Sequence, residues 1–190
     1  MTLLETLRCE GGHPLHLSYH QQRLDETLET LGIPLSFDLS SLIVPPGEGV
    51  WRCRFLYGSQ GYDIEFHPYT PRPMKRLRLV QADTLAYPFK YADRNALDLL
   101  YAQRRECDDV LIVRNGLLTD TTIANIALLI EGAWLTPQKP LLRGTTRERL
   151  LEEGFLRAAP LTTEDIAKAR GIAVMNAMLG FVEVENGIII

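Results

Sequence analysis

The sequence lacks the features that mark secreted, membrane-spanning and nucleic-acid-binding proteins. Its three cysteines are widely spaced and form neither a disulfide framework nor a CxxC pair, which indicates a reducing compartment such as the cytoplasm. No segment reaches the roughly 18 uninterrupted apolar residues of a membrane span, and the N-terminus, which has an acid and no basic stretch, does not resemble a signal peptide. The net charge of −4 argues against a nucleic-acid-binding protein, because such proteins carry a basic surface.

Lysine is also scarce. Four of the 20 basic residues are lysines, and the other 16 are arginines. Arginine binds carboxylates and phosphates through a planar fork, whereas lysine can lose its proton and act as an amine nucleophile. Few residues are therefore candidates for amine chemistry, namely Lys75, Lys90, Lys139 and Lys168.

The pattern of strands and short helices is typical of an α+β protein with two lobes. The first part predicts strands over 3–9, 50–57 and 62–66, and a helix over 18–31 whose leucines share one face before it ends at Gly32. Two prolines make the segment 69–73 the best linker candidate. We therefore predict a small α+β domain over 1–72 and a larger domain over 73–190.

The larger domain is predicted to contain a helix over 93–105, with Asp93 as its N-cap. A β-meander follows, in which Asn115-Gly116 is a strong hairpin turn signal. Thr145 and Glu148 have the spacing of a capping box at the start of a further short helix. The strands expected in this domain are 75–80, 110–113, 117–120, 123–130, 133–136, 172–175 and 181–184.

Lys90 is the lysine with the most unusual surroundings. It lies between Phe89 and Tyr91, just ahead of the predicted helix. Desolvation among aromatic rings lowers the pKa of an amine and makes it a usable nucleophile for a carbonyl. The alternative interpretation is a surface lysine whose stem lies along apolar groups.

Three further polar features each allow a functional and a purely structural interpretation. Gly144-Thr145-Thr146 at a helix start can bind an anion through free N–H groups and hydroxyls, or it can simply cap the helix. Arg23 flanks the apolar face of the first helix and can bind an anion or cover the edge of the core. Asp120 ends a predicted strand, where aspartate commonly bonds its own turn.

We expect no metal site. His16 and His20 are spaced to share one helix face, but no cysteine or carboxylate completes a ligand set at suitable spacing. The sequence also contains no Gly-rich phosphate loop and no GxSxG motif.

Five segments follow the order and spacing of one family over about residues 4–184. They are His20-x-x-Arg23-Leu24 for an HxxRL motif, Lys90 ahead of its helix, Leu118-Thr119-Asp120-x-x-x-x-Asn125-Ile126 for VTEGxxxNxF, Gly144-Thr145-Thr146-Arg147 for GITR, and Asn176-Ala177-Met178-Leu179-Gly180 for a late NxL segment. The chain thereby resembles the class IV aminotransferases, which are pyridoxal-phosphate (PLP) enzymes of fold type IV. That family includes branched-chain and D-amino-acid aminotransferases and aminodeoxychorismate lyase.

The resemblance implies a small α+β lobe, a larger β-barrel-like lobe and PLP in the cleft between them. Lys90 matches the lysine that forms the Schiff base and moves the substrate's proton. The carboxylate at Asp120 matches the group that keeps a proton on the pyridine nitrogen. Besides Lys90 and Asp120, the resemblance assigns five residues to the cofactor. They are expected to bind its phosphate, and they are Arg23, Thr145, Thr146, Asn176 and Ala177.

Two departures from the family pattern stand out. We expect the family's opening segment ahead of its ETxR strand to be missing, because Leu4-Glu5-Thr6-Leu7-Arg8 stands almost at the N-terminus, and Asp120 replaces a glutamate. The resemblance favours a reaction like that of aminodeoxychorismate lyase, which forms 4-aminobenzoate and pyruvate. The alternatives are transamination of branched-chain or D-amino acids, and a non-catalytic protein that binds a phosphate ligand. We expect a homodimer that acts on a small amine or amino acid.

Overall fold

The chain divides at Pro71, inside the predicted linker. The computed structural model describes residues 1–184 and 187–189, and these form two units: Met1–Pro71 with Phe89–Asp93, and Arg72–Pro88 with Arg94–Ile190. The sequence-based division at residue 72 placed residues 89–93 in the larger domain, whereas in the structure they belong to the first unit. Lys90 therefore lies in the first unit.

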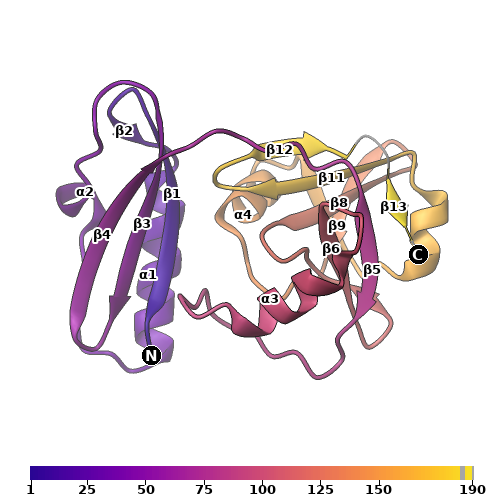
Figure 1. Ribbon diagram of the computed structural model, residues 1–190, viewed down its shortest axis with the longest axis horizontal. Helices are drawn as coiled ribbons and strands as arrows, with labels where there is room; N and C mark the ends of the chain where they lie inside the picture. Colours follow the sequence, from indigo (N-terminus) through magenta and orange to yellow (C-terminus); the bar gives the residue numbers. More distant parts are fainter. Residues whose placement is uncertain (185–186, 190) are drawn as a thin grey trace. The chain divides into compact units, whose positions relative to one another are not determined.

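The first unit is a four-stranded antiparallel sheet in the order β2-β1-β3-β4, with α1 along one face (Figure 1). The predicted strands and the predicted helix are confirmed, and Gly32 follows the helix with a positive φ of 63°. The elements of this unit are β1 (Leu3–Glu10), β2 (His13–Pro14), α1 (Leu17–Thr30), α2 (Leu39–Leu42), β3 (Val50–Gly58) and β4 (Gly61–Pro68).

Alternation along β1 decides which face of this sheet is buried. Leu3, Leu7 and Cys9 point to the side covered by α1, where they pack against Leu24 and Leu28 of the helix. Glu5 has the same parity and is also completely buried. The core of the first unit therefore contains one carboxylate on an otherwise apolar strand face.

The segment 89–93 pairs with the beginning of β1. Leu4 N donates a hydrogen bond to Lys90 O at 2.8 Å, and Leu3 and Tyr91 form an antiparallel bridge. The rings of Phe89 and Tyr91 meet edge to face at 6.1 Å and pack against the core of the unit. Lys90 is thus held by its backbone to a strand and flanked by two ordered aromatic rings.

The second unit contains two sheets, and with the first unit it confirms the α+β class. The four-stranded sheet has the order β13-β5-β6-β7, and the five-stranded sheet has the order β10-β9-β8-β11-β12. The elements of this unit are β5 (Leu77–Gln81), α3 (Asn95–Tyr101), η1 (Ala102–Arg104), β6 (Asp109–Arg114), β7 (Leu117–Leu118), β8 (Asn125–Ile130), β9 (Ala133–Pro137), α4 (Thr145–Glu152), β10 (Leu156–Ala159), η2 (Thr163–Lys168), β11 (Gly171–Asn176), β12 (Gly180–Glu183) and β13 (Ile188–Ile189). No helix of the described residues is both long and apolar enough to cross a membrane.

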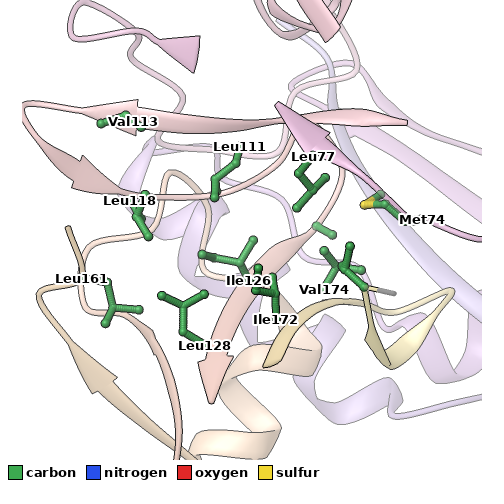
Figure 2. Packing of buried hydrophobic residues seen from close by; sticks show 12 residues of the cluster. Met74, Leu77, Leu111, Val113, Leu118, Ile126, Leu128, Leu161, Ile172 and Val174 are labelled. Atoms are coloured by element: carbon green, nitrogen blue, oxygen red, sulfur yellow. The ribbon is translucent and has the colours of Figure 1, made fainter. Parts of the chain in front are cut away.

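Apolar side chains from both sheets share one core (Figure 2). Leu77 and Leu111 come from the four-stranded sheet, and Ile126, Leu128 and Val174 come from the five-stranded sheet. All five are completely excluded from solvent. This core fixes the ends of the strands from which the polar residues of the second unit project.

The predicted single meander is divided between the two sheets. β6 pairs with β7 in one sheet, whereas β8 pairs with β9 in the other. Between them the chain makes a tight turn, in which the Thr121 hydroxyl oxygen accepts hydrogen bonds from Ile123 N at 3.2 Å and Ala124 N at 3.0 Å. The predicted strand over 123–130 therefore begins at Asn125.

Two predicted helix starts are wrong. α3 begins at Asn95 with Arg94 at the N-cap, because Asp93 is held in the first unit. α4 has Gly144 at its N-cap and no side-chain cap, because glycine has no side chain, and Glu148 binds the arginines on either side of the helix start. These starts depend on contacts made outside the helices.

Candidate functional site

The first unit contains a buried cluster of charged and polar groups around Glu5. Arg23 donates to the Glu5 carboxylate through Nε, at 2.8 Å from Oε1, and through Nη2, at 2.6 Å from Oε2. His20 Nδ1 lies 2.7 Å from the same Oε2. Glu5 and His20 are buried, and the Arg23 side chain is 15% exposed. The carboxylate thus orients one guanidinium and one imidazole.

The ionisation of this cluster follows from its geometry. Burial alone would raise the pKa of Glu5, but the charge of Arg23 and the bonds from His20 and Arg23 lower it to about 2. Burial lowers the pKa of His20, although its bond to Glu5 opposes this. Glu5 is therefore ionised and His20 neutral at pH 7. Because a carboxylate only accepts hydrogen bonds, His20 Nδ1 carries the proton.

Lys90 lies beside this cluster. Its backbone is bonded to Leu4, the neighbour of Glu5, and its charge contributes to the lowered pKa of His20. The structure thus brings together Lys90 and Arg23, as two of the predicted site residues, around a glutamate to which the sequence assigned no role. The feature of the sequence that could have indicated a role for Glu5 is its place on β1, where an acid occupies an inward-facing position and the other inward-facing residues are apolar.

The second unit contains a hydrogen-bonded network centred on Asp120. Asn125 Nδ2 donates to Asp120 Oδ1 at 2.9 Å and to Leu142 O at 2.8 Å. Leu142 N donates to Asp120 Oδ2 at 2.9 Å, which closes the ring of bonds. Asp120 and Asn125 are both buried. The carboxylate and the loop that leads into α4 are therefore fixed to each other.

Burial raises the pKa of Asp120 to about 7, although the bonds from Leu142 and Asn125 and the charge of Arg147 oppose the shift. Arg147 is itself buried, where it donates to Pro137 O at 2.8 Å and also binds Glu148. A carboxyl group whose pKa is near 7 can hold or release a proton at neutral pH at little free-energy cost.

The start of α4 combines three features that suit an anion. The first N–H groups of a helix point outward without helical partners, and the positive end of the helix dipole lies there. Thr145 and Thr146 occupy the first two helical positions and are both buried. Gly144 precedes these two threonines. It lies so close to Asn125 that a Cβ added at Gly144 would overlap Asn125 Oδ1 and lie 3.2 Å from Asn125 Cγ.

Replacing Gly144 by alanine is expected to destabilise the second unit by about 1–3 kcal/mol, because the methyl group overpacks the Asn125 amide. The backbone of Gly144, with φ of −72° and ψ of 139°, is open to any residue, so conformational strain does not contribute. The measurement is the free energy of unfolding in denaturant. Gly47→Ala is the control, because a Cβ at Gly47 meets nothing within 4 Å. Equal stability of the two variants would contradict the expectation.

Asn176 uses its side chain to order the turn between β11 and β12. Its Oδ1 accepts hydrogen bonds from Met178 N at 2.9 Å and Leu179 N at 2.8 Å. Its Nδ2 donates to Ile123 O at 3.1 Å, which ties this turn to the one that carries Asp120. The structure thus connects Asp120 with Asn176 and with the loop that leads into α4, whereas the cofactor contacts of Asn176 and Ala177 stay predictions.

The sequence profile of the family described as amino-transferase class IV matches residues 66–186. An uncharacterised protein from Haemophilus influenzae is 34% identical over 184 residues, which cover 94% of this chain and 98% of that protein. The chain belongs to the class IV aminotransferase family.

Two solved structures share the fold. A protein from Haemophilus somnus, provisionally named a 4-amino-4-deoxychorismate lyase, is 35% identical with a TM-score of 0.88 over 94% of this chain and 97% of that one. A protein from Mesorhizobium loti, provisionally named an amino-acid aminotransferase, is 22% identical with a TM-score of 0.81 over 99% of both chains. The second likeness shows the fold alone.

The class IV aminotransferase family is PLP-dependent, and each unit, taken by itself, contains groups whose chemistry suits that cofactor. The first unit offers the half-buried Lys90 amine. The second offers the Asp120 carboxyl group and the Thr145-Thr146 helix start. Two bonds leave Asp120 with acceptor capacity, since an ionised carboxylate has about four acceptor sites. Arg23 is engaged with Glu5, and its contact with the phosphate stays a prediction.

Proposed function

We propose that the chain is a PLP-dependent enzyme that acts on the amino group of a small molecule. The observation that supports this most is Lys90, which is held by its backbone to β1 and flanked by Phe89 and Tyr91. A protein that only bound phosphate would have no use for an amine fixed in this way. The proposal also rests on membership of a PLP-dependent family.

PLP supplies an aldehyde and an electron-withdrawing ring, which can accept the electron pair released at the carbon next to the substrate nitrogen. Lys90 would hold the cofactor through its Nζ and would take and return a proton at the substrate carbon. The Asp120 carboxyl group would hold a proton beside the ring nitrogen. Thr145 and Thr146 would bind the phosphate through hydroxyl and backbone N–H groups.

Within this class we favour the reaction of 4-amino-4-deoxychorismate lyase. The 35%-identical Haemophilus somnus protein, which matches nearly the whole chain, supports this choice. Lys90 would remove the proton from the carbon of the substrate ring that carries the amino nitrogen. Loss of the side chain as pyruvate then leaves the aromatic 4-aminobenzoate.

Transamination is the other reaction that these residues could support. There Lys90 would carry the proton from the substrate carbon to the cofactor carbon instead of driving elimination. The two reactions differ in their products, because transamination releases an oxo acid and leaves the cofactor in its amine form. Product analysis with 4-amino-4-deoxychorismate, and with branched-chain and D-amino acids, separates them.

The cheapest test of the proposal is reconstitution with PLP. We expect a visible absorbance band and, after borohydride reduction, irreversible attachment of the cofactor to the peptide that contains Lys90. Peptide mass spectrometry identifies the modified lysine. Saturable PLP binding without any trapped adduct would favour the non-catalytic phosphate-binding alternative, and attachment at another lysine would overturn the assignment of Lys90.

A further inference from the structure

The side chain of Asn125 touches both ends of the polar network in the second unit. Its two amide hydrogens are both used, one by Asp120 Oδ1 and one by Leu142 O. Its Oδ1 lies against Gly144, the N-cap of α4. One carboxamide therefore connects the buried carboxylate, the loop ahead of the helix and the helix start itself.

Local structure explains why Asn125 occupies this place. The turn stabilised by Thr121 brings Asn125 opposite Asp120 as an isolated antiparallel bridge. Leu142 is held from both sides, since its N–H binds Asp120 and its C=O binds Asn125. Leu142 lies two residues before Gly144, so this pair of bonds determines where α4 begins.

We propose that Asn125 is a positioning residue that sets the spacing between Asp120 and the start of α4, so that both can bind one PLP molecule. This inference rests on the proposed function and extends it to a residue that contacts neither the substrate nor the reacting atoms. The ring nitrogen and the phosphate belong to one small molecule, so the groups that bind them must be held at a fixed separation.

The shape and chemistry of the side chain both matter for this role. Aspartate would keep the shape but lose both donors, and it would place a second carboxylate against Asp120. Alanine would remove both bonds and leave Leu142 O without its amide partner. Glycine at position 144 is matched to the amide, because any larger residue there overlaps Asn125 Oδ1.

The test compares the affinities for PLP and for pyridoxal, which lacks the phosphate. The affinity ratio is the dissociation constant of pyridoxal divided by that of PLP. In the unaltered chain, this ratio measures the contribution of the phosphate site when the ring is bound. In Asn125→Ala we expect this ratio to fall about tenfold to hundredfold, the effect of losing hydrogen bonds made to a charged group. Asn125→Asp should show the same direction of change.

Thr136→Val is the matched control. Thr136 is completely buried in the same sheet and donates one hydrogen bond, to Ile126 O at 2.8 Å rather than to Asp120 or Leu142. We expect a lower melting temperature and an unchanged affinity ratio. If Asn125→Ala also left the ratio unchanged while lowering the melting temperature, Asn125 would have only a structural role and the proposal would be overturned.

Gly144→Ala tests the same contact from the helix side and covers the case in which Asn125→Ala does not fold. By itself it should lower the affinity ratio, but in an Asn125→Ala background it should have little further effect. Fully additive effects on the ratio would contradict the coupling. Absence of any borohydride-trapped adduct in the unaltered chain is a different result, since it would overturn the proposed function itself.

Discussion

Lys90→Ala is expected to abolish both the borohydride-trapped adduct and turnover. Without the amine, the aldehyde carbon of PLP has no protein nucleophile, and the proton at the substrate carbon has no acceptor. The loss of the acid–base role alone should lower kcat by about 10²–10⁴-fold. The measurements are absorbance after reconstitution, mass spectrometry of the reduced protein, and turnover of 4-amino-4-deoxychorismate.

The scarcity of lysine makes the control for this experiment complete. Alanine replacement of each remaining lysine should leave the adduct and turnover in place, and these lysines are Lys75, Lys139 and Lys168. The melting temperature of Lys90→Ala must also stay close to that of the unaltered chain, so that unfolding does not imitate lost chemistry. A trapped adduct in Lys90→Ala would refute the role assigned to Lys90.

Glu5→Ala is expected to cause the largest loss of stability. It removes the carboxylate that holds Arg23 by two hydrogen bonds and His20 by one. Breaking a buried ion pair by removing one partner costs about 3–5 kcal/mol, because the other charge stays buried without compensation. For a chain of this size the melting temperature should fall by about 6–20 °C. Glu10→Ala, an exposed position on the same strand, is the control.

The same cluster predicts how stability depends on acid. The folded pKa of Glu5 is about 2, below its ordinary value of 4.5, so the stabilisation is complete above pH 4.5 and is lost as the pH falls towards 2. His20 also makes the stability fall as the pH falls, but at higher pH than Glu5. Because the pKa of His20 is lowered in the folded protein, acid protonates this side chain in the unfolded chain first. Denaturant titrations should show a steeper acid loss in the unaltered chain than in Glu5→Gln.

The catalytic candidates were predictable where local chemistry carries the signal. Lys90 stands out because lysine is rare and its neighbours are aromatic, and Thr145 and Thr146 stand out because they open a helix. No role was predicted from the sequence for Glu5 or for Asn125. Glu5 binds partners 15 and 18 residues away, and Asn125 binds Asp120 across a turn and Leu142 17 residues away, so these pairings become visible only in the folded chain.

The errors in the fold have the same origin. Gly144 rather than Thr145 caps α4, and the expected capping partner Glu148 binds Arg143 and Arg147. The segment β10 was not predicted, since its sequence Leu156–Ala159 has no clear alternation and it is held by parallel pairing with β9. Periodicity reports which face of an element is apolar, but it does not report which strand will become its neighbour.

The pairing of residues 89–93 with β1 has a consequence for how the protein is made. During synthesis on a ribosome, N-terminal domains generally fold first, as soon as their chain has emerged. Here the first unit needs residues 89–93, which follow a stretch of the second unit, Arg72–Pro88. A nascent chain that ends at residue 72 therefore carries an unpaired edge at Leu3 and Leu4. The first unit gains these contacts with Leu3 and Leu4 only when residues 89–93 arrive, so Lys90 and the last contacts of that unit appear in the same step.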